Sequence, residues 1–345
     1  MKVLVTGHHG YIGSVLAPLL ADAGHDVEGL DTYFYRGCDF GVDGALLPER
    51  AADVRDLEPT ELEGFDAIVH LAALSNDPLG DLDPSLTDDV NHRGTLHLAR
   101  AAREAGVRRF VFASSCSMYG VSGTDDALDE SAPLRPMTAY AESKVRAEEG
   151  LFALAGADFA PVSMRNGTAY GASPRLRLDI VLNNLAAWAH TTGRIKLLSD
   201  GTAWRPLVHI RDIAKTALAL LAAPEETIRG EAFNIGSDAQ NYRIRELAEV
   251  LAEVSGCEIE VAAGSVADQR SYRVDFSKLE RTFPDLALEW NAERGARELV
   301  DAYRRDSLTW DEFQGNRYVR LRRLLSLLGE DALDPQLRWQ APLVA

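Results

Sequence analysis

The chain has 345 residues and a mass of 37.7 kDa, with 46% hydrophobic and 26% charged residues. These fractions are typical of globular proteins and exclude a disordered or collagen-like chain. The 53 acidic and 36 basic residues give a net charge of −17, which argues against nucleic acid and anionic membranes as partners. At this length we expect two domains, or one large α/β domain with an appendage.

The three cysteines, Cys38, Cys116 and Cys257, stand far apart, and no CxxC pair occurs. The sequence therefore predicts no disulfide framework and no metal site. The chain begins with a strand-like run rather than a signal peptide, and its apolar runs are shorter than the ~18 residues of a membrane span. We expect a cytoplasmic protein.

Short β-branched runs alternate with helical stretches along the chain. This alternation predicts an α/β fold with a doubly wound parallel sheet and a smaller C-terminal substrate lobe. Residues 1–172, with returning segments at about 204–236, form the first expected domain, and 173–203 with 237–345 form the lobe and a C-terminal tail. Strands are expected at 3–5, 27–30, 67–70, 110–113, 159–164, 205–210 and 232–235, and helices at 12–23, 86–105, 139–154, 211–223, 244–255 and from 292.

Gly7, Gly10 and Gly13 follow the first strand and open the first helix, in the segment TGHHGYIG. Such glycines let the chain reverse, let the backbone approach a pyrophosphate, and let helix and strand pack closely, while the helix N-terminus faces the anion. The spacing is G-x-x-G-x-x-G rather than G-x-G-x-x-G. It predicts a Rossmann-type dinucleotide site rather than a turn without a ligand.

Asp31 ends the second strand, where an acidic residue about 20 positions beyond the glycines can bind the adenosine ribose 2′-hydroxyl. A carboxylate would repel a 2′-phosphate, so NAD is favoured, although Arg36 is near enough in sequence to leave NADP open. Asp53 and Val54 follow a short strand and are candidates for adenine contacts, with an ordinary loop acid as the alternative for Asp53.

Tyr140 and Lys144 are four residues apart, so on a helix they share one face. A nearby ammonium and a cationic nicotinamide ring would lower the tyrosine pKa from its usual ~10. The tyrosine can then take a proton from a sugar hydroxyl as hydride leaves for NAD⁺. By itself a Y-x-x-x-K pattern is often a solvated helix face.

A serine cluster, Ser114, Ser115 and Ser117, ends the strand that precedes this helix. Ligands bind at strand carboxyl ends in open α/β sheets, and a hydroxyl there can bond the same substrate oxygen as the tyrosine. A loop with helix caps explains the serines equally well when they are considered alone. The glycine turn and the Tyr140–Lys144 pair favour an active site.

The motifs together resemble extended short-chain dehydrogenases/reductases of the nucleotide-sugar epimerase/dehydratase group, from residue 1 to about 280. The shared segments are TGHHGYIG, LD, HLAA, VNHRGT, SSCSMYG, YAESK and WRPLVHIRDIA. The resemblance implies NAD as cofactor and a catalytic group of Ser115, Lys144 and the base Tyr140. With the reasoning above, the expected cofactor-binding residues are Gly7, Gly10, Tyr11, Ile12, Gly13, Asp31, Asp53, Val54, Leu71, Ala72, Ala73, Asn91, Ser114, Tyr140 and Lys144.

The later motifs concern the substrate. Arg205 and Arg270 match family arginines that meet the nucleotide diphosphate and the nucleotide end, and arginine suits bidentate phosphate binding. Arg175 and Arg177, in SPRLRLD, are interpreted as surface charges. The expected substrate-binding residues are Ser117, Asn166, Thr168, Asn184, Arg205 and Arg270.

Three departures from the family pattern stand out. Cys116-Ser117 replaces the Asp-Glu pair with which 4,6-dehydratases eliminate water. Thr168 stands where the family often has asparagine, with Asn166 displaced from that place. The C-terminal tail, from Phe283, is longer than the usual family ending, and it would cover the substrate lobe or a subunit interface.

The leading functional hypothesis is C4 epimerisation of a nucleotide-diphosphate sugar through a transient 4-keto intermediate. An NAD(P)H-dependent 4-ketoreductase of a deoxysugar is the alternative, with a decarboxylase or a non-catalytic nucleotide-binding protein less favoured. By resemblance, a homodimer is expected through the helices that begin near Leu86 and Ala139, where the apolar stretches 96–99 and 145–154 allow it.

Overall fold

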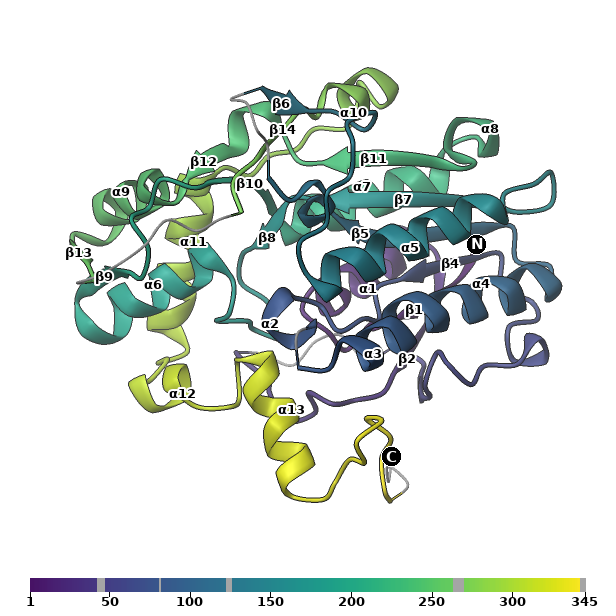
Figure 1. Cartoon of the computed structure of the whole chain (residues 1–345), viewed down its shortest axis with the longest axis horizontal. Helices are drawn as coiled ribbons and strands as arrows, with labels where there is room; N and C mark the ends of the chain where they lie inside the picture. The colour runs from purple at the N-terminus through teal and green to yellow at the C-terminus, as the bar shows by residue number, and fades with distance from the viewer. Residues whose placement is uncertain (42–46, 81, 122–125, 263–269, 342–345) are drawn as a thin grey trace.

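The computed structural model describes residues 1–41, 47–80, 82–121, 126–262 and 270–341. At its centre is a seven-stranded sheet, in which every neighbouring pair of strands is parallel (Figure 1). The predicted doubly wound parallel sheet is thereby confirmed. In spatial order the strands are β11 (Glu231–Ile235), β7 (Ala160–Asn166), β5 (Arg109–Ser115), β4 (Ala67–His70), β1 (Lys2–Thr6), β2 (Asp26–Asp31) and β3 (Glu49–Ala51).

Helices cover both faces of the sheet because alternate strand residues point to opposite sides. Val3 and Val5 of β1 share a core with α1 (Gly13–Asp22) and α7 (Ile210–Ala222). Leu4, between them, packs on the other face with α4 (Gly94–Glu104) and α5 (Ala139–Ala153). All residues of β4 and β7 are buried, as expected of parallel strands enclosed by helices.

The helix expected at 86–105 is interrupted. It consists of α3 (Pro84–Thr87), a π-helical segment over Asp88–Arg93, and α4. Wide π turns are rare and frequently occur at functional sites. Here the wide turn contains Asn91, whose side chain reaches across to the loop that follows β4.

The second lobe is built on small sheets. In the first of these, β10 (Trp204–His209) lies between β8 (Thr168–Tyr170) and β12 (Asn241–Arg243). The segment at 204–209 therefore does not return to the main sheet, which regains only α7 and β11 from this part of the chain. The other pairs are β9 (Arg194–Leu197) with β13 (Glu258–Val261) and β6 (Ala127–Leu128) with β14 (Arg273–Val274).

The helices of this lobe are α6 (Val181–Thr192), α9 (Ile244–Ser255) and α11 (Ala292–Arg305), which enclose one hydrophobic core. Leu185, Leu247 and Leu299 contribute one side chain to it from each helix. The remaining short helices are α2 (Asp77–Gly80), α8 (Glu225–Ile228) and α10 (Ser277–Thr282).

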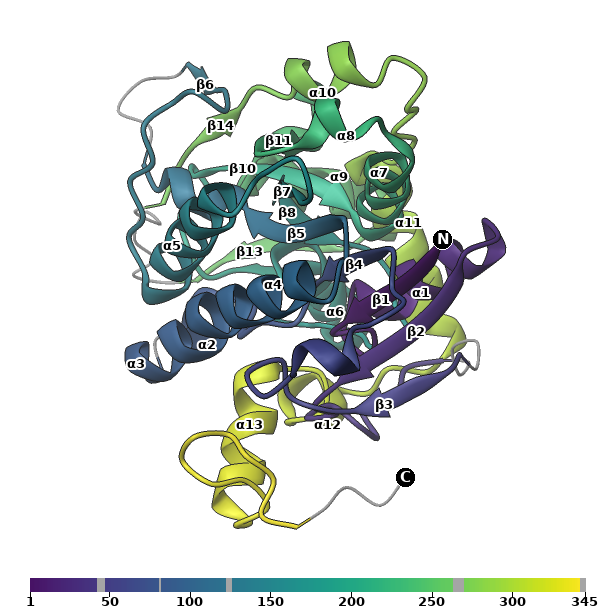
Figure 2. The same cartoon turned by 90° about the vertical axis from the view of Figure 1, so that its right-hand side faces the viewer.

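Beyond α11, the C-terminal tail contacts both lobes: Phe313 joins the core of the second lobe, and the later part of the tail packs against the first lobe. The tail contains α12 (Trp310–Gln314) and α13 (Arg320–Gly329), drawn in yellow below the sheet in Figures 1 and 2. Four leucines of the tail enclose a core with three from the loop and helices that follow β4. These leucines are Leu324, Leu327, Leu333 and Leu337 of the tail with Leu74, Leu79 and Leu86.

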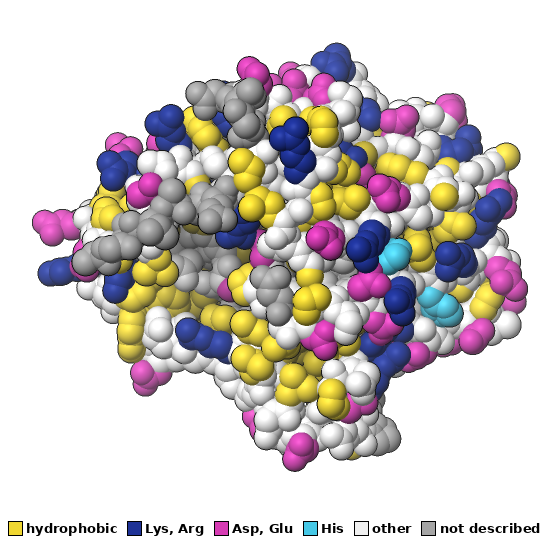
Figure 3. Space-filling view, viewed as in Figure 1, with side chains coloured by type: hydrophobic (Ala, Val, Ile, Leu, Met, Phe, Trp, Pro, Cys, Tyr) yellow, Lys and Arg dark blue, Asp and Glu magenta, His cyan; other side chains and the backbone are white. Residues whose placement is uncertain are grey.

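Among the described residues, no helix combines the length and apolar character that a membrane span needs. On the face seen in Figure 3, basic side chains are interspersed with acidic ones rather than gathered into a broad basic area.

Candidate active site

The carboxyl ends of the central strands open on a cavity of about 790 Å³, closed on its other side by the second lobe and the tail. Ligands of open α/β sheets bind at this edge. All the residues predicted for cofactor, substrate and catalysis line the cavity except Asn91. Those on its wall are Gly7, Gly10, Tyr11, Ile12, Gly13, Asp31, Asp53, Val54, Leu71, Ala72, Ala73, Ser114, Ser115, Ser117, Tyr140, Lys144, Asn166, Thr168, Asn184, Arg205 and Arg270.

The glycine turn has the geometry that a pyrophosphate needs. Gly7 has a φ of +74°, and a Cβ there would lie 2.7 Å from the backbone nitrogen of Ala72. A Cβ on Gly13 would collide with the carbonyl oxygen of Gly7. Within the described chain no side chain caps the first turn of α1, although the N–H groups of Ser14 and Val15 already donate to the carbonyls of Gly10 and Ile12.

Asp31 lies at the adenosine end of the cavity. Its carboxylate accepts hydrogen bonds from the backbone N–H groups of Tyr33, at 2.8 Å, and His9, at 3.1 Å, while burial raises its pKa. Arg36 stacks on the Tyr33 ring, 5.0 Å from its centroid, and is not among the described residues that line the cavity. The arrangement therefore fits a free ribose 2′-hydroxyl better than a 2′-phosphate.

Asn91 does not contact the cavity, contrary to the sequence prediction. Its amide accepts from the Leu74 N–H at 2.8 Å and donates to the Leu74 carbonyl at 3.0 Å. It also donates to the Ser143 hydroxyl at 3.1 Å. Asn91 thus fixes the cavity-lining loop after β4 to helix α5, and it acts on the site through Leu74.

Three predicted catalytic residues come together where β5 ends. Thr138 caps α5 by accepting from the Ala141 N–H at 3.2 Å, and Tyr140 and Lys144 follow on one face of that helix. Ser115 lies close enough to the Tyr140 side chain to favour its ionised form. The Lys144 ammonium donates to the Ala113 carbonyl at 2.8 Å and lies 5.9 Å from the centre of the Tyr140 ring.

The sequence predicted that a nearby ammonium would lower the pKa of Tyr140. Taken together, the protein's own groups raise it instead. Burial raises that pKa to about 12, and the Asp77 carboxylate adds to the effect, while Ser115 and Arg177 oppose it. Burial also lowers the pKa of Lys144 to about 7. The prediction named two cations that could lower the Tyr140 pKa. Because burial disfavours the charged form of Lys144, the nicotinamide ring is the cation that remains for this role.

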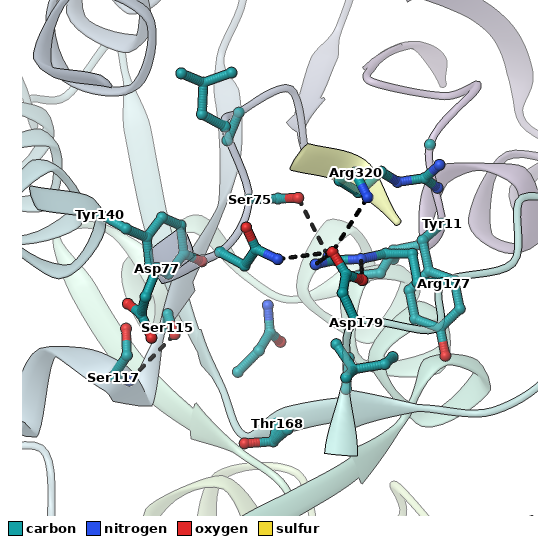
Figure 4. Close-up of a pocket in the computed structure, with 18 of the residues that line it drawn as sticks. Tyr11, Ser75, Asp77, Ser115, Ser117, Tyr140, Thr168, Arg177, Asp179 and Arg320 are labelled. Carbon is teal, nitrogen blue, oxygen red and sulfur yellow. Dashed lines mark hydrogen bonds and ion pairs between the residues drawn. The ribbon is translucent and has the colours of Figure 1, made fainter. Parts of the chain in front are cut away.

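Asp77 is a site residue that sequence reasoning missed. It accepts from the Thr138 hydroxyl at 2.7 Å, forms an ion pair with Arg270, and points toward Ser115 and Ser117 in Figure 4. The sequence signal that could have identified Asp77 is its place a few residues beyond β4. Polar residues that follow the carboxyl end of a strand lie on the ligand side of the sheet.

Arg175 and Arg177 are buried, so the surface-charge interpretation was wrong. Arg177 lines the cavity, where its guanidinium donates to Asp179 at 2.9 Å and to the Ser75 hydroxyl at 3.2 Å (Figure 4). Arg175 donates to the ring of His9 at 3.1 Å. Burial of a charged guanidinium requires such partners.

The substrate side of the cavity holds polar groups that the protein leaves unsatisfied. Ser117 Oγ and Asn166 Oδ1 are buried without a hydrogen-bond partner in the part of the chain that the structure describes. Arg205 and Arg270 meet on the wall of the cavity that the second lobe provides, which we call the far wall. There the Arg205 guanidinium donates to the Arg270 carbonyl. Asp268 and Gln269, which precede Arg270 in its motif, lie outside the described residues. Buried unsatisfied groups in a cavity indicate a polar ligand.

A dinucleotide held at the glycine turn would extend along the strand ends toward the hydroxyls of Ser115 and Tyr140, which line the same cavity. This is the arrangement of dinucleotide-dependent enzymes of the short-chain dehydrogenase/reductase type. The model of the NAD dependent epimerase/dehydratase family matches residues 3–236, and the chain belongs to that family. It is an enzyme, and NAD is its cofactor.

Known proteins similar to the chain include both epimerases and dehydratases. The UDP-glucose 4-epimerase of Bacillus subtilis is 27% identical over 92% of this chain and 99% of its own length. The structure of MoeE5 with UDP-glucuronic acid and NAD has a TM-score of 0.76 at 27% identity, over 89% of this chain and all of that one. DesIV, a dTDP-glucose 4,6-dehydratase from Streptomyces venezuelae, has a TM-score of 0.76 at 27% identity, over 89% and 98%.

Proposed function

We propose that the protein epimerises a nucleotide-diphosphate sugar at C4 through a transient 4-keto intermediate. The observation that carries the proposal is the placement of Ser115 and Tyr140 together on the cavity wall, next to a position that lacks dehydratase chemistry. Cys116 stands there instead of an acid, and burial raises the pKa of its thiol. A buried neutral thiol does not remove or deliver the proton that elimination of water requires.

In this mechanism Tyr140 accepts the proton of the C4 hydroxyl, and Ser115 holds the same oxygen by a hydrogen bond. NAD, when bound, supplies the hydride acceptor and donor. Lys144 lies on the same face of α5, 5.9 Å from the centre of the Tyr140 ring, and its charged form would stabilise the tyrosinate, although burial lowers the pKa of the ammonium. Tyr140 returns the proton after the keto sugar has turned its other face to the cofactor. The residues that would hold NAD are those of the glycine turn, Asp31 and the Leu71–Ala73 strand end.

The far wall supports a nucleotide-diphosphate sugar as substrate. Arg205 and Arg270 supply two guanidinium groups that suit a diphosphate, and Asn184 of α6 lines the same cavity. Ser117 and Asn166 offer unsatisfied oxygens to sugar hydroxyls, with Thr168 nearby on β8. The similar B. subtilis enzyme, named for UDP-glucose, and the MoeE5 complex with UDP-glucuronic acid favour a uridine nucleotide.

The organisation proposed for the chain follows from this assignment. The first lobe, residues 1–172 with α7 and β11, would hold NAD, and the second lobe would hold the nucleotide end of the substrate. A cytoplasmic location and a homodimer remain predictions. The apolar side chains that suggested dimerisation, Leu96, Leu98 and Leu151, are buried in the subunit's own core, so the dimer rests on family resemblance, and sedimentation velocity would test it.

The alternative is a 4-ketoreductase, which would use the same residues with exchangeable NAD(P)H. To separate the two, the purified protein is first analysed for nucleotide released by acid. It is then incubated with UDP-, dTDP-, GDP- and CDP-sugars without added cofactor. Epimer formation supports the proposal, whereas conversion only with stoichiometric NADPH oxidation would replace it with the ketoreductase. No turnover, with a Tyr140→Phe variant that behaves identically, would favour a binding protein.

A further inference from the structure

The C-terminal tail is attached along the adenosine edge of the cavity. The Trp339 indole N–H donates to the Thr32 carbonyl at 2.6 Å, and the Arg338 guanidinium lies 2.9 Å from the Asp53 carboxylate. Arg323 donates to the Phe34 carbonyl at 3.3 Å. Thr32, Phe34 and Asp53 all line the cavity, so the tail closes the end where the adenosine of NAD is expected.

The first residue of α13, Arg320, reaches the cavity wall. Its side chain is 2% exposed, and its guanidinium lies 4.0 Å above the centre of the Tyr35 ring. Nη2 donates to the Arg175 carbonyl at 3.0 Å. Nη1 is buried and has no hydrogen-bond partner among the described residues. An unsatisfied N–H on a buried cation is costly in the free protein and is expected where a ligand completes the site.

The carboxylates near Arg320 are already bound elsewhere. Asp179 accepts from Arg177 and from the Asn76 amide, and only the backbone N–H of Arg320 approaches it, at 3.4 Å. Asp31 accepts from two backbone N–H groups. Within the described chain Arg320 forms no ion pair, and Asp31 and Asp179 act on its charge only from a longer distance, while it lines the cavity beside Arg177 and Tyr11 (Figure 4).

We propose that Arg320 binds the pyrophosphate of NAD and that the tail retains the cofactor by closing over its adenosine half. A guanidinium satisfies a phosphate with two parallel N–H bonds, and Nη1 supplies one that the protein leaves unused. The advantage of retention rests on the proposed function, because an epimerase regenerates its NAD in every cycle and does not need to release it. The binding role of Arg320 requires only that NAD is the cofactor.

The test compares Arg320→Met with Arg322→Met, a matched change on the same helix, where Arg322 is exposed and donates to the Gln314 carbonyl. Binding of NAD, ADP, adenosine, 2′,5′-ADP and UDP is measured by calorimetry on the full-length protein after removal of bound nucleotide. For Arg320→Met we expect NAD and ADP to bind about 10- to 100-fold more weakly, because a charge-assisted pair is lost, with adenosine unchanged. The Arg322→Met variant should match the wild type.

Thermal unfolding of the nucleotide-free protein distinguishes binding from structure. Arg320→Met should leave that midpoint unchanged or raise it, while reducing the increase that NAD produces. A lowered midpoint with normal ADP affinity would show a structural role and overturn the proposal. If Arg320→Met weakened only the binding of UDP, or only the binding of 2′,5′-ADP, Arg320 would contact a different phosphate. Either result would also overturn the proposal.

A Trp339→Ala variant tests retention without altering the buried guanidinium. Loss of its bond to Thr32 should accelerate release of NAD from the holoprotein several-fold. The release is measured as the amount of nucleotide that remains bound after dilution. Release at the wild-type rate would contradict the retaining role, even if Arg320→Met failed to fold. If the wild type bound no NAD, the proposed function would fail as well, whereas normal NAD binding with unaffected variants would overturn only the role of the tail.

Discussion

The two ends of the cavity are built in different ways. At the catalytic end, Ser115, Tyr140 and Lys144 come from one strand and the next helix of the main sheet, and a hydrogen bond to the Ala113 carbonyl holds Lys144. At the adenosine end, the wall is completed by a tail whose contact from Trp339 to Thr32 spans 307 residues. The catalytic end is therefore part of the rigid core, whereas the adenosine end depends on an attachment that can be weakened by itself.

The largest expected effect lies at the catalytic end. Tyr140→Phe should lower kcat by about 10²- to 10⁴-fold, because proton transfer by a positioned side chain contributes that much. Bound NAD should remain at the wild-type level. The matched change Tyr35→Phe removes a hydroxyl from the other end of the same cavity and should leave kcat within about 2-fold. Equal losses in both variants would show that the two ends are not separable.

On the far wall, Arg270→Met should raise the KM for the nucleotide sugar by about 10- to 100-fold with little change in kcat. The arginine binds a part of the substrate that does not react, so its contribution is the same in ground and transition states. Steady-state kinetics separates the effect on KM from the effect on kcat, with Arg294→Met as the exposed control. A fall in kcat with unchanged KM would place Arg270 at the reacting sugar instead.

Asn91→Ala tests a residue that shapes the site without touching it. Loss of its three hydrogen bonds leaves the buried Leu74 N–H unsatisfied, which should cost about 1–3 kcal/mol in the free energy of unfolding. Urea denaturation measures that cost. NAD affinity should fall only modestly, since Leu74 keeps its packing with the tail. A large loss of NAD affinity at normal stability would restore Asn91 as a cofactor contact.

The smallest expected effect is a shift in pH dependence. Asp77 raises the pKa of Tyr140, so Asp77→Asn should lower that pKa. The base form of Tyr140 would then be populated at lower pH, and the acidic limb of the kcat profile should move to lower pH by up to about 1 unit. Asp56→Asn, outside the cavity wall, should leave the profile in place. A limb that moved to higher pH would contradict the sign of this interaction.

Much of the catalytic end could be predicted because its motifs are local. The glycine turn, the serine cluster and Tyr140 each follow a strand or begin a helix, so alternation along the chain places them at one sheet edge. Arg320 could not be found in this way, since its partners are decided by packing between distant segments. Burial of Arg177, the position of β10 and the π turn at Asn91 likewise follow from tertiary contacts that no spacing reveals.

The central claim is that hydride leaves C4 and returns to C4 within one active site. A nucleotide hexose labelled with deuterium at C4 tests it most directly, with the purified protein, no added cofactor and ordinary water. The account predicts that both epimers retain the deuterium at C4, as measured by NMR and mass spectrometry of the equilibrated sugars. Deuterium lost to solvent or transferred to free NAD would contradict it.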